Sequence, residues 1–81
     1  MNKDMIFTEL KKVIVEFVPD INEEHIKIED SLKDLGTNSV DRMDIIIGIM
    51  EILKVKIPLV QFGNVNNIQG IVDLLHRECI S

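Results

Sequence analysis

The stretch Asp34–Asp44 reads Asp-Leu-Gly-Thr-Asn-Ser-Val-Asp-Arg-Met-Asp, and it lies where a glycine-containing loop is predicted to become a helix. The hydroxyl of Ser39 falls at the start of that helix. There the backbone N–H groups have no partner inside the helix and form the positive end of its dipole. Such an end favours a phosphate group. Ser39 is therefore a candidate site for a covalent phosphodiester.

A simpler interpretation of Ser39 is that it only caps the helix, because serine is among the most common N-cap residues. The preceding residue, Asn38, is an equally favourable cap. A capping box needs Glu or Gln three residues after the cap, and that position after Ser39 holds Arg42. The local pattern alone therefore leaves both interpretations of the serine open.

A calcium-binding loop is another interpretation of the acidic stretch Asp34–Asp44. Such a loop needs glycine at its sixth position to make a sharp turn. That position is occupied here by Ser39. We therefore predict no metal site.

Apolar residues recur at intervals of three and four in three segments, which predicts three amphipathic helices. The first is predicted over Met5–Val18, where Pro19 ends it, and the second over Ser39–Leu53. The third begins after Asn66 or Asn67, either of which is a favourable cap. The predicted core faces are Ile6, Leu10, Val13, Ile14 and Phe17; Ile45, Ile46, Ile49, Ile52 and Leu53; and Ile68, Ile71, Val72, Leu74 and Leu75.

The connections between these helices are too apolar for flexible linkers. Residues 19–38 carry isoleucines and leucines that we expect to pin the loop to the helices, with a short helical turn at Asn22–His25. Pro58–Gly63 is predicted to form a further short turn, ended by Gly63-Asn64, in which Leu59, Val60 and Phe62 face inward. The expected fold is all-α: a small four-helix bundle of three main helices and one short helix.

A second apolar stripe runs along the predicted second helix, beside its core face. It consists of Val40, Met43, Ile47 and Met50 and begins directly after Ser39. A helix that packs on one side of a small bundle needs only one apolar face. The stripe therefore predicts an exposed docking surface, unless the third helix or the long loop covers it. Gly48 in this helix favours close approach by a partner or by a neighbouring helix.

Composition restricts the class of protein. The 81 residues suffice for one domain, predicted over residues 1–81, and 46% are apolar. The net charge of −5 argues against a nucleic-acid partner and favours partners with basic patches. The single cysteine, Cys79, fits a reducing compartment, and no apolar run approaches the ~20 residues that span a bilayer. We expect a cytoplasmic monomer without a signal peptide or a membrane contact.

The stretch Asp34-Leu35-Gly36-x-Asn38-Ser39-Val40-Asp41 resembles the phosphopantetheine attachment motif of acyl carrier proteins, Asp-Leu-Gly-x-Asp-Ser-Leu. The resemblance covers nearly the whole chain, since it includes the first helix, the long loop, Ile57-Pro58 and the final helix that opens at Asn66. Asn38 stands where most members carry Asp. With Val40-Asp41-Arg42, it resembles freestanding carriers of polyketide synthase clusters that serve in β-branching, where an acetyl-type unit is added at a β-keto carbon.

The resemblance implies that Ser39 receives 4'-phosphopantetheine from coenzyme A through a phosphopantetheinyl transferase, and that the arm then carries acyl groups as thioesters. It implies an acyltransferase, a ketosynthase or a hydroxymethylglutaryl-synthase-like enzyme as partners, while the carrier itself is no enzyme. The implied partner contacts are Val40, Asp41, Arg42, Met43, Asp44, Ile47, Met50 and Glu51. The implied acyl groove is lined by Ile46, Leu59, Val60 and Phe62.

The sequence leaves several alternatives open. Within the carrier class, the chain fits a fatty-acid carrier or a peptidyl carrier. A carrier that no longer accepts the arm is a further alternative, because of Asn38. Outside the class, it fits an unmodified helical module that binds a partner through its second stripe.

Overall fold

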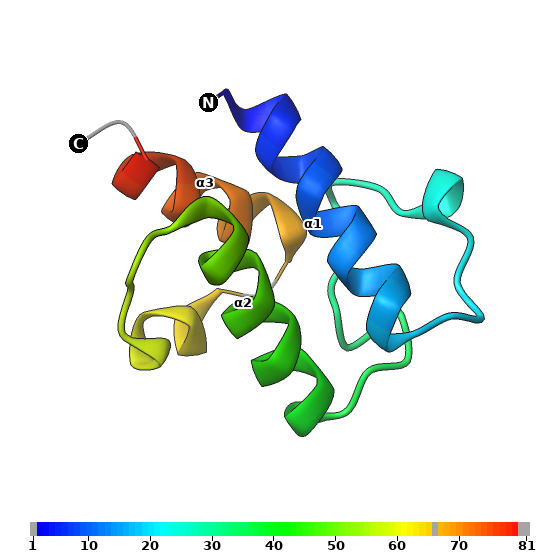
Figure 1. Cartoon of the computed structure of the whole chain (residues 1–81). Coiled ribbons are helices and arrows are strands. Elements are labelled where there is room, and N and C mark those ends of the chain that lie inside the picture. Colours follow the sequence, from blue (N-terminus) through cyan, green and yellow to red (C-terminus); the bar gives the residue numbers. More distant parts are fainter. Residues whose placement is uncertain (1, 66, 80–81) are drawn as a thin grey trace.

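The computed structural model of the protein describes residues 2–65 and 67–79. These residues form three α-helices and two short 3₁₀ helices, with no strand among them (Figure 1). The all-α expectation is confirmed. The elements in chain order are α1 (Lys3–Phe17), η1 (Glu23–His25), α2 (Ser39–Leu53), η2 (Leu59–Asn64) and α3 (Ile68–Cys79).

The helix α1 begins at Lys3, earlier than the predicted Met5. The cause is a cap that the apolar spacing does not report: the Asn2 side chain accepts a hydrogen bond from the Met5 N–H at 2.8 Å. The helix ends at Phe17, one residue before the predicted Val18 and two before Pro19. Asn67 caps the start of α3 by accepting a bond from the Gly70 N–H at 2.9 Å. The alternative cap, Asn66, lies outside the described residues.

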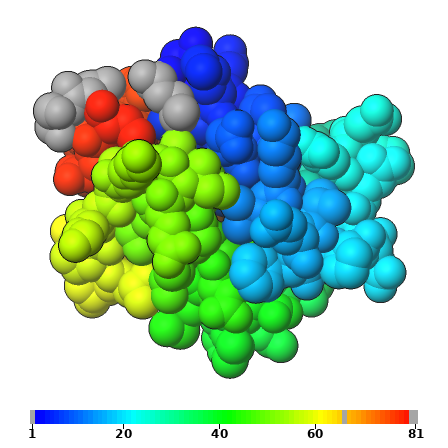
Figure 2. Space-filling model, in the orientation of Figure 1, coloured from blue at the N-terminus to red at the C-terminus, as the bar shows by residue number. Residues whose placement is uncertain are grey.

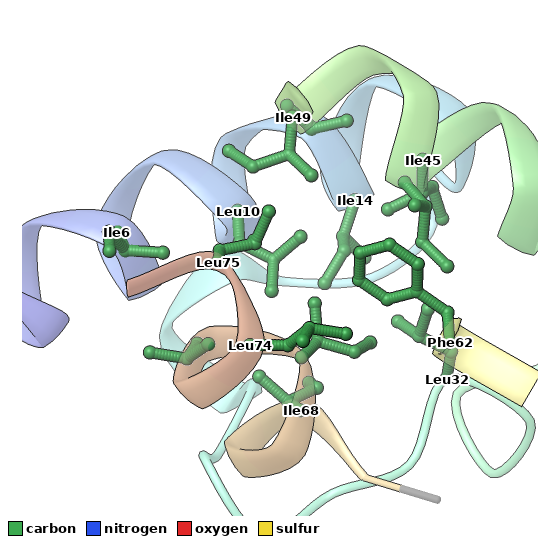
Figure 3. Packing of buried hydrophobic residues seen from close by; sticks show 14 of the residues in the cluster. Ile6, Leu10, Ile14, Leu32, Ile45, Ile49, Phe62, Ile68, Leu74 and Leu75 are labelled. Carbon is green, nitrogen blue, oxygen red and sulfur yellow. The ribbon is translucent and has the colours of Figure 1, made fainter. Parts of the chain in front are cut away.

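The three α-helices share one apolar core, and α1 packs against both α2 and α3. Figure 3 shows the labelled side chains of these helices pointing toward one another, with Leu32 and Phe62 closing the core from the connecting segments. The eight largest fully buried side chains all come from α1, α2 and α3. They are Ile6, Leu10, Ile14, Ile45, Ile49, Ile68, Val72 and Leu75. The periodicity therefore identified the central positions of each face correctly.

Two side chains assigned to the core are exposed instead. Ile52 is 50% exposed, and Phe17 is also exposed. Both lie in the last turn of their helices. Helical spacing gives the face on which a residue lies but not how far along the helix that face is covered.

The long connection between α1 and α2 is fixed to the core, as predicted. Ile26 and Leu32 are buried. Two backbone hydrogen bonds of 2.8 Å tie the loop to the start of α3, from the Ile68 N–H to the Asp30 carbonyl and from the Gln69 N–H to the Ile28 carbonyl. The loop therefore has a defined path, and it delivers the chain to the start of α2.

Gly48 permits a close approach between α1 and α2. A Cβ atom at this position would lie 3.3 Å from Cγ1 of Val13, which is closer than most real contacts of a Cβ atom. The sequence left open whether Gly48 makes room for a partner or for a neighbouring helix. The structure shows that it makes room for α1. Among the described residues, no helix has the length and apolar character needed to cross a membrane.

Candidate functional site

The start of α2 is capped by Asn38 and not by Ser39. The Asn38 side-chain oxygen accepts a hydrogen bond from the Asp41 N–H at 2.8 Å. Ser39 is the first residue of the helix, and its side chain is exposed. Within the described part of the chain, no hydrogen bond involves the Ser39 hydroxyl. The interpretation of Ser39 as a cap is wrong, and its hydroxyl is open to chemistry.

The turn before Ser39 is held from both sides. Gly36 adopts a φ of 91°, a left-handed conformation that favours glycine. Next to it, Thr37 is buried and donates a hydrogen bond from its hydroxyl to the Leu32 carbonyl at 2.6 Å. From the helix side, Arg42 donates from Nη1 to the Thr37 carbonyl at 3.0 Å. The backbone that presents the serine is therefore anchored to the loop and to α2.

Neither a role for Thr37 nor a structural role for Arg42 was predicted from the sequence. The sequence did contain one signal for the structural role of Arg42, because residues three apart lie on the same helix face. Arg42 follows Ser39 at that spacing, so its long side chain reaches back over the first turn. The predicted partner contact Arg42 is thus half-buried and already bonded within the chain.

A groove with a volume of about 540 Å³ opens beside Ser39. Three of the four predicted groove residues line it: Ile46, Leu59 and Phe62. Further apolar walls come from the loop, α2 and α3, and two cationic side chains also lie on the lining. The remaining lining residues are Ser31, Leu32, Lys33, Arg42, Met43, Gly63, Val65, Asn67 and Ile71.

Val60 does not face inward, and that prediction is wrong. Its side chain is 80% exposed and does not line the groove. The helix η2 continues to Asn64, one residue past the predicted end at Gly63. The exposure of Val60 follows from the 3₁₀ geometry of this helix. A 3₁₀ helix has three residues per turn, so Leu59 and Phe62 share one side while Val60 points away from it.

Three of the four residues of the second stripe on α2 are exposed, as predicted. Val40 is 64% exposed, Met43 50% and Ile47 39%, while Met50 is half-buried against the core. Figure 2 shows α2, in green, open at the surface of the view. The predicted contacts Asp44 and Glu51 are exposed on the same helix, and Asp41 is half-buried in its first turn. These residues all belong to α2, whose first residue is Ser39.

Comparison with known proteins identifies the family. Residues 9–75 match the family model described as the phosphopantetheine attachment site. Over 76 residues the chain is 37% identical to the polyketide biosynthesis acyl-carrier-protein AcpK of Bacillus subtilis (strain 168), which covers 94% of this chain and 93% of the relative. The chain belongs to the acyl carrier protein family. The match includes Ser39, the loop before it and the groove beside it.

A solved structure supports the same assignment of this carrier. The fold matches a chain in the crystal structure of the curacin biosynthetic pathway HMG synthase in complex with acetyl donor-ACP, with a TM-score of 0.83. The sequences are 35% identical, and the match covers 91% of this carrier and 95% of that chain. The resemblance to acyl carriers that the sequence predicts is therefore confirmed at the level of both sequence and fold.

The prosthetic group of this family is 4'-phosphopantetheine, and the geometry of the carrier fits it. A phosphodiester needs an accessible hydroxyl, which the exposed side chain of Ser39 provides. The hydroxyl borders a groove that is walled by apolar side chains and also holds Lys33 and Arg42, whose charges are opposite to that of a phosphodiester. The Ser39 hydroxyl is not used to cap α2, because the Asn38 side chain accepts the capping hydrogen bond.

Proposed function

We propose that this carrier holds acyl groups as thioesters on a 4'-phosphopantetheine arm at Ser39 and acts as a donor carrier in polyketide β-branching. The observation that supports attachment of the arm is the exposed Ser39 hydroxyl, which is free because Asn38 caps the helix. The likeness to AcpK and to the chain crystallised with an HMG synthase supports the pathway. The donated unit is an acetyl-type group.

The residues of the carrier present the serine and leave the chemistry to partners. A phosphopantetheinyl transferase would take the proton from Ser39. The hydroxyl oxygen would then bond to the phosphorus nearer the pantetheine in coenzyme A, the pyrophosphate bond would break, and adenosine 3',5'-bisphosphate would leave. When bound, the arm supplies a thiol that holds the acyl group as a thioester. Asp41, the nearest acidic residue in the first turn, is favourably placed for the helix dipole. We assign no general base to the carrier, and we propose that it is not itself an enzyme.

The surface on α2 is proposed to receive the partners in turn. Its exposed apolar stripe offers contact area, and Asp41, Asp44 and Glu51 add negative charge beside it. That pattern suits enzymes with an apolar patch edged by basic residues. The proposed partners are the phosphopantetheinyl transferase, an acyltransferase, a ketosynthase and an HMG-synthase-like enzyme. We further propose that residues 1–81 form one domain, which works as a cytoplasmic monomer.

The deciding experiment is the intact mass of the carrier before and after incubation with coenzyme A, magnesium and a broad-specificity phosphopantetheinyl transferase. The wild type should gain one phosphopantetheine, and Ser39→Ala should gain none. A folded wild type that gains no mass would overturn the attachment and favour an unmodified interaction module.

A second experiment tests the pathway. The acetyl-loaded carrier should donate its acetyl group to an HMG-synthase-like enzyme, followed by loss of the acetyl mass from the arm. A peptidyl carrier of the same size serves as the control and should not donate. A carrier that is loaded only with amino acids would contradict the polyketide assignment while leaving Ser39 as the attachment site.

A further inference from the structure

Two cations share the groove with the attachment serine. Lys33, from the long loop, and Arg42, from the first turns of α2, both line the groove that borders Ser39. The described residues on this lining include no Asp or Glu. This grouping stands out because the chain as a whole has 14 acidic residues and only 9 basic ones.

Neither cation is neutralised within the described part of the chain. The ion pairs there join Lys3 to Asp73 and Lys12 to Glu9, and neither Lys33 nor Arg42 takes part. An anion in a groove that is lined by two cations and by no described carboxylate is attracted to both charges. The groove therefore has the electrostatic character of an anion site.

The guanidinium of Arg42 is fixed in place. Its Nη1 donates to the Thr37 carbonyl at 3.0 Å, and Thr37 is itself buried and bonded to the Leu32 carbonyl. A guanidinium has five N–H donors, so this one bond leaves others free for an anion. Because the side chain is held in advance, less conformational entropy is lost when it binds a phosphate oxygen. Lys33, which is exposed, adds a mobile point charge.

We propose that Lys33 and Arg42 bind the phosphodiester that joins the arm to Ser39 and thereby turn the arm into the groove. The inference rests on the proposed attachment at Ser39. The phosphodiester carries one negative charge at neutral pH and is tethered to a residue on the lining of the same groove. Ile46 and Phe62, deeper in the groove, then cover the apolar part of the arm or its acyl group. The pair acts as a positioning site and takes no part in thioester chemistry.

The test compares the apo-carrier with the carrier that holds a free-thiol phosphopantetheine arm, loaded from coenzyme A. Two signals report the position of the arm: the ³¹P resonance of the phosphodiester, and the change in the amide resonances of Phe62, Gly63 and Ile71 on loading. In the wild type, these amides should shift on loading, and the shift should weaken in 1 M KCl, where the screening length falls to about 3 Å.

Lys33→Ala is the main variant, because it removes a cation without touching the bond between Arg42 and Thr37. It should lower the ratio of docked to free arm by roughly two- to fivefold, as expected for one partly exposed charge pair. Arg42→Ala should have a larger effect, and Arg42→Lys should recover part of it. The matched control is Lys56→Ala, an exposed lysine away from this groove, which should behave as the wild type.

The outcomes separate the two proposals. If the wild type gains the mass of the arm but Lys33→Ala and Arg42→Ala leave both signals unchanged, the anion site is wrong and the attachment stands. If the folded wild type gains no mass, both proposals fail together. If Arg42→Ala does not fold, Lys33→Ala and the salt dependence still decide the question.

Discussion

The side-chain oxygen of Asn38 accepts a hydrogen bond from the Asp41 N–H at 2.8 Å, so the residue before the attachment serine caps α2. Asn38 replaces the Asp of the usual carrier motif and keeps its oxygen acceptor. Asn38→Ala should lower the free energy of unfolding by about 1 kcal/mol, the usual value of an N-cap. Ser39→Ala should leave it nearly unchanged. Urea unfolding followed by circular dichroism measures both, and an equal loss in the two variants would contradict the assignment of the cap.

The exposed stripe on α2 should govern the rate at which partners use the carrier. Replacing Met43 or Ile47 with Ala should lower kcat/KM for arm transfer roughly five- to tenfold, because an anchor side chain at an interface typically contributes more than 1 kcal/mol. Ile52→Ala is the matched control, since Ile52 is equally exposed on α2 but lies outside the stripe. The rate is followed by intact mass at low carrier concentration. Equal losses in all three variants would argue against docking through the stripe.

Two residues of η2, Phe62 in the groove wall and Val60 outside it, should respond very differently to truncation. Phe62 is 6% exposed, and Phe62→Ala should cost about 3 kcal/mol of stability. Val60 is on the solvent side, so Val60→Ala should change stability by less than about 0.5 kcal/mol. Thermal unfolding of the two variants checks this. A large loss from Val60→Ala would mean that the side chain faces inward, as the apolar pattern alone indicated.

The contact between α1 and α2 at Gly48 should limit the size of that residue. Gly48→Ala gains helix propensity, which offsets the tightening against Val13, so stability should change by less than about 1 kcal/mol. Gly48→Leu should cost about 1–3 kcal/mol, because the larger side chain separates the two helices. Gly63→Ala is a control in open space. Full tolerance of Leu at position 48 would contradict the close packing.

The ion pair between Lys3 and Asp73 should give a small acid-dependent stability. The hydrogen bond from Lys3, and then the one from Gln69, hold the pKa of Asp73 below its ordinary value of 3.8. A lowered folded pKa adds stability at pH values above 3.8, and this stability is lost as the pH falls through the folded pKa. Both partners are about half exposed, so Asp73→Asn should cost less than about 1 kcal/mol at pH 7.

The measurement for this pair is urea unfolding at pH 7 and at pH 2.5, with and without 1 M KCl. The difference between wild type and Asp73→Asn should shrink at the lower pH and in high salt. Glu9→Gln, which removes the longer pair with Lys12 at 3.7 Å, serves as the comparison and should have a smaller effect. A difference that grows as the pH falls would contradict the direction of the pKa change.

Local signals in the sequence predicted most of the fold and the position of the attachment serine. The bounds of α2, the positions of Ile45 and Ile49 in the core, and the exposed serine at the start of the helix follow from spacing and from residue type. These features depend on neighbours within a few residues along the chain. The choice between Asn38 and Ser39 as the cap did not follow, because both residues are suitable and only the backbone geometry selects one.

The sequence by itself determined that three amphipathic helices form and that Ser39 stands at the start of the second, since helical periodicity and chain breakers act locally. Only the tertiary structure decided which apolar side chains are covered. Val60 and Ile52 are exposed because burial depends on the segment that packs opposite, which periodicity does not report. The tertiary structure also brought Lys33 and Arg42 to one groove, because the fixed path of the loop joins residues that no local pattern connects.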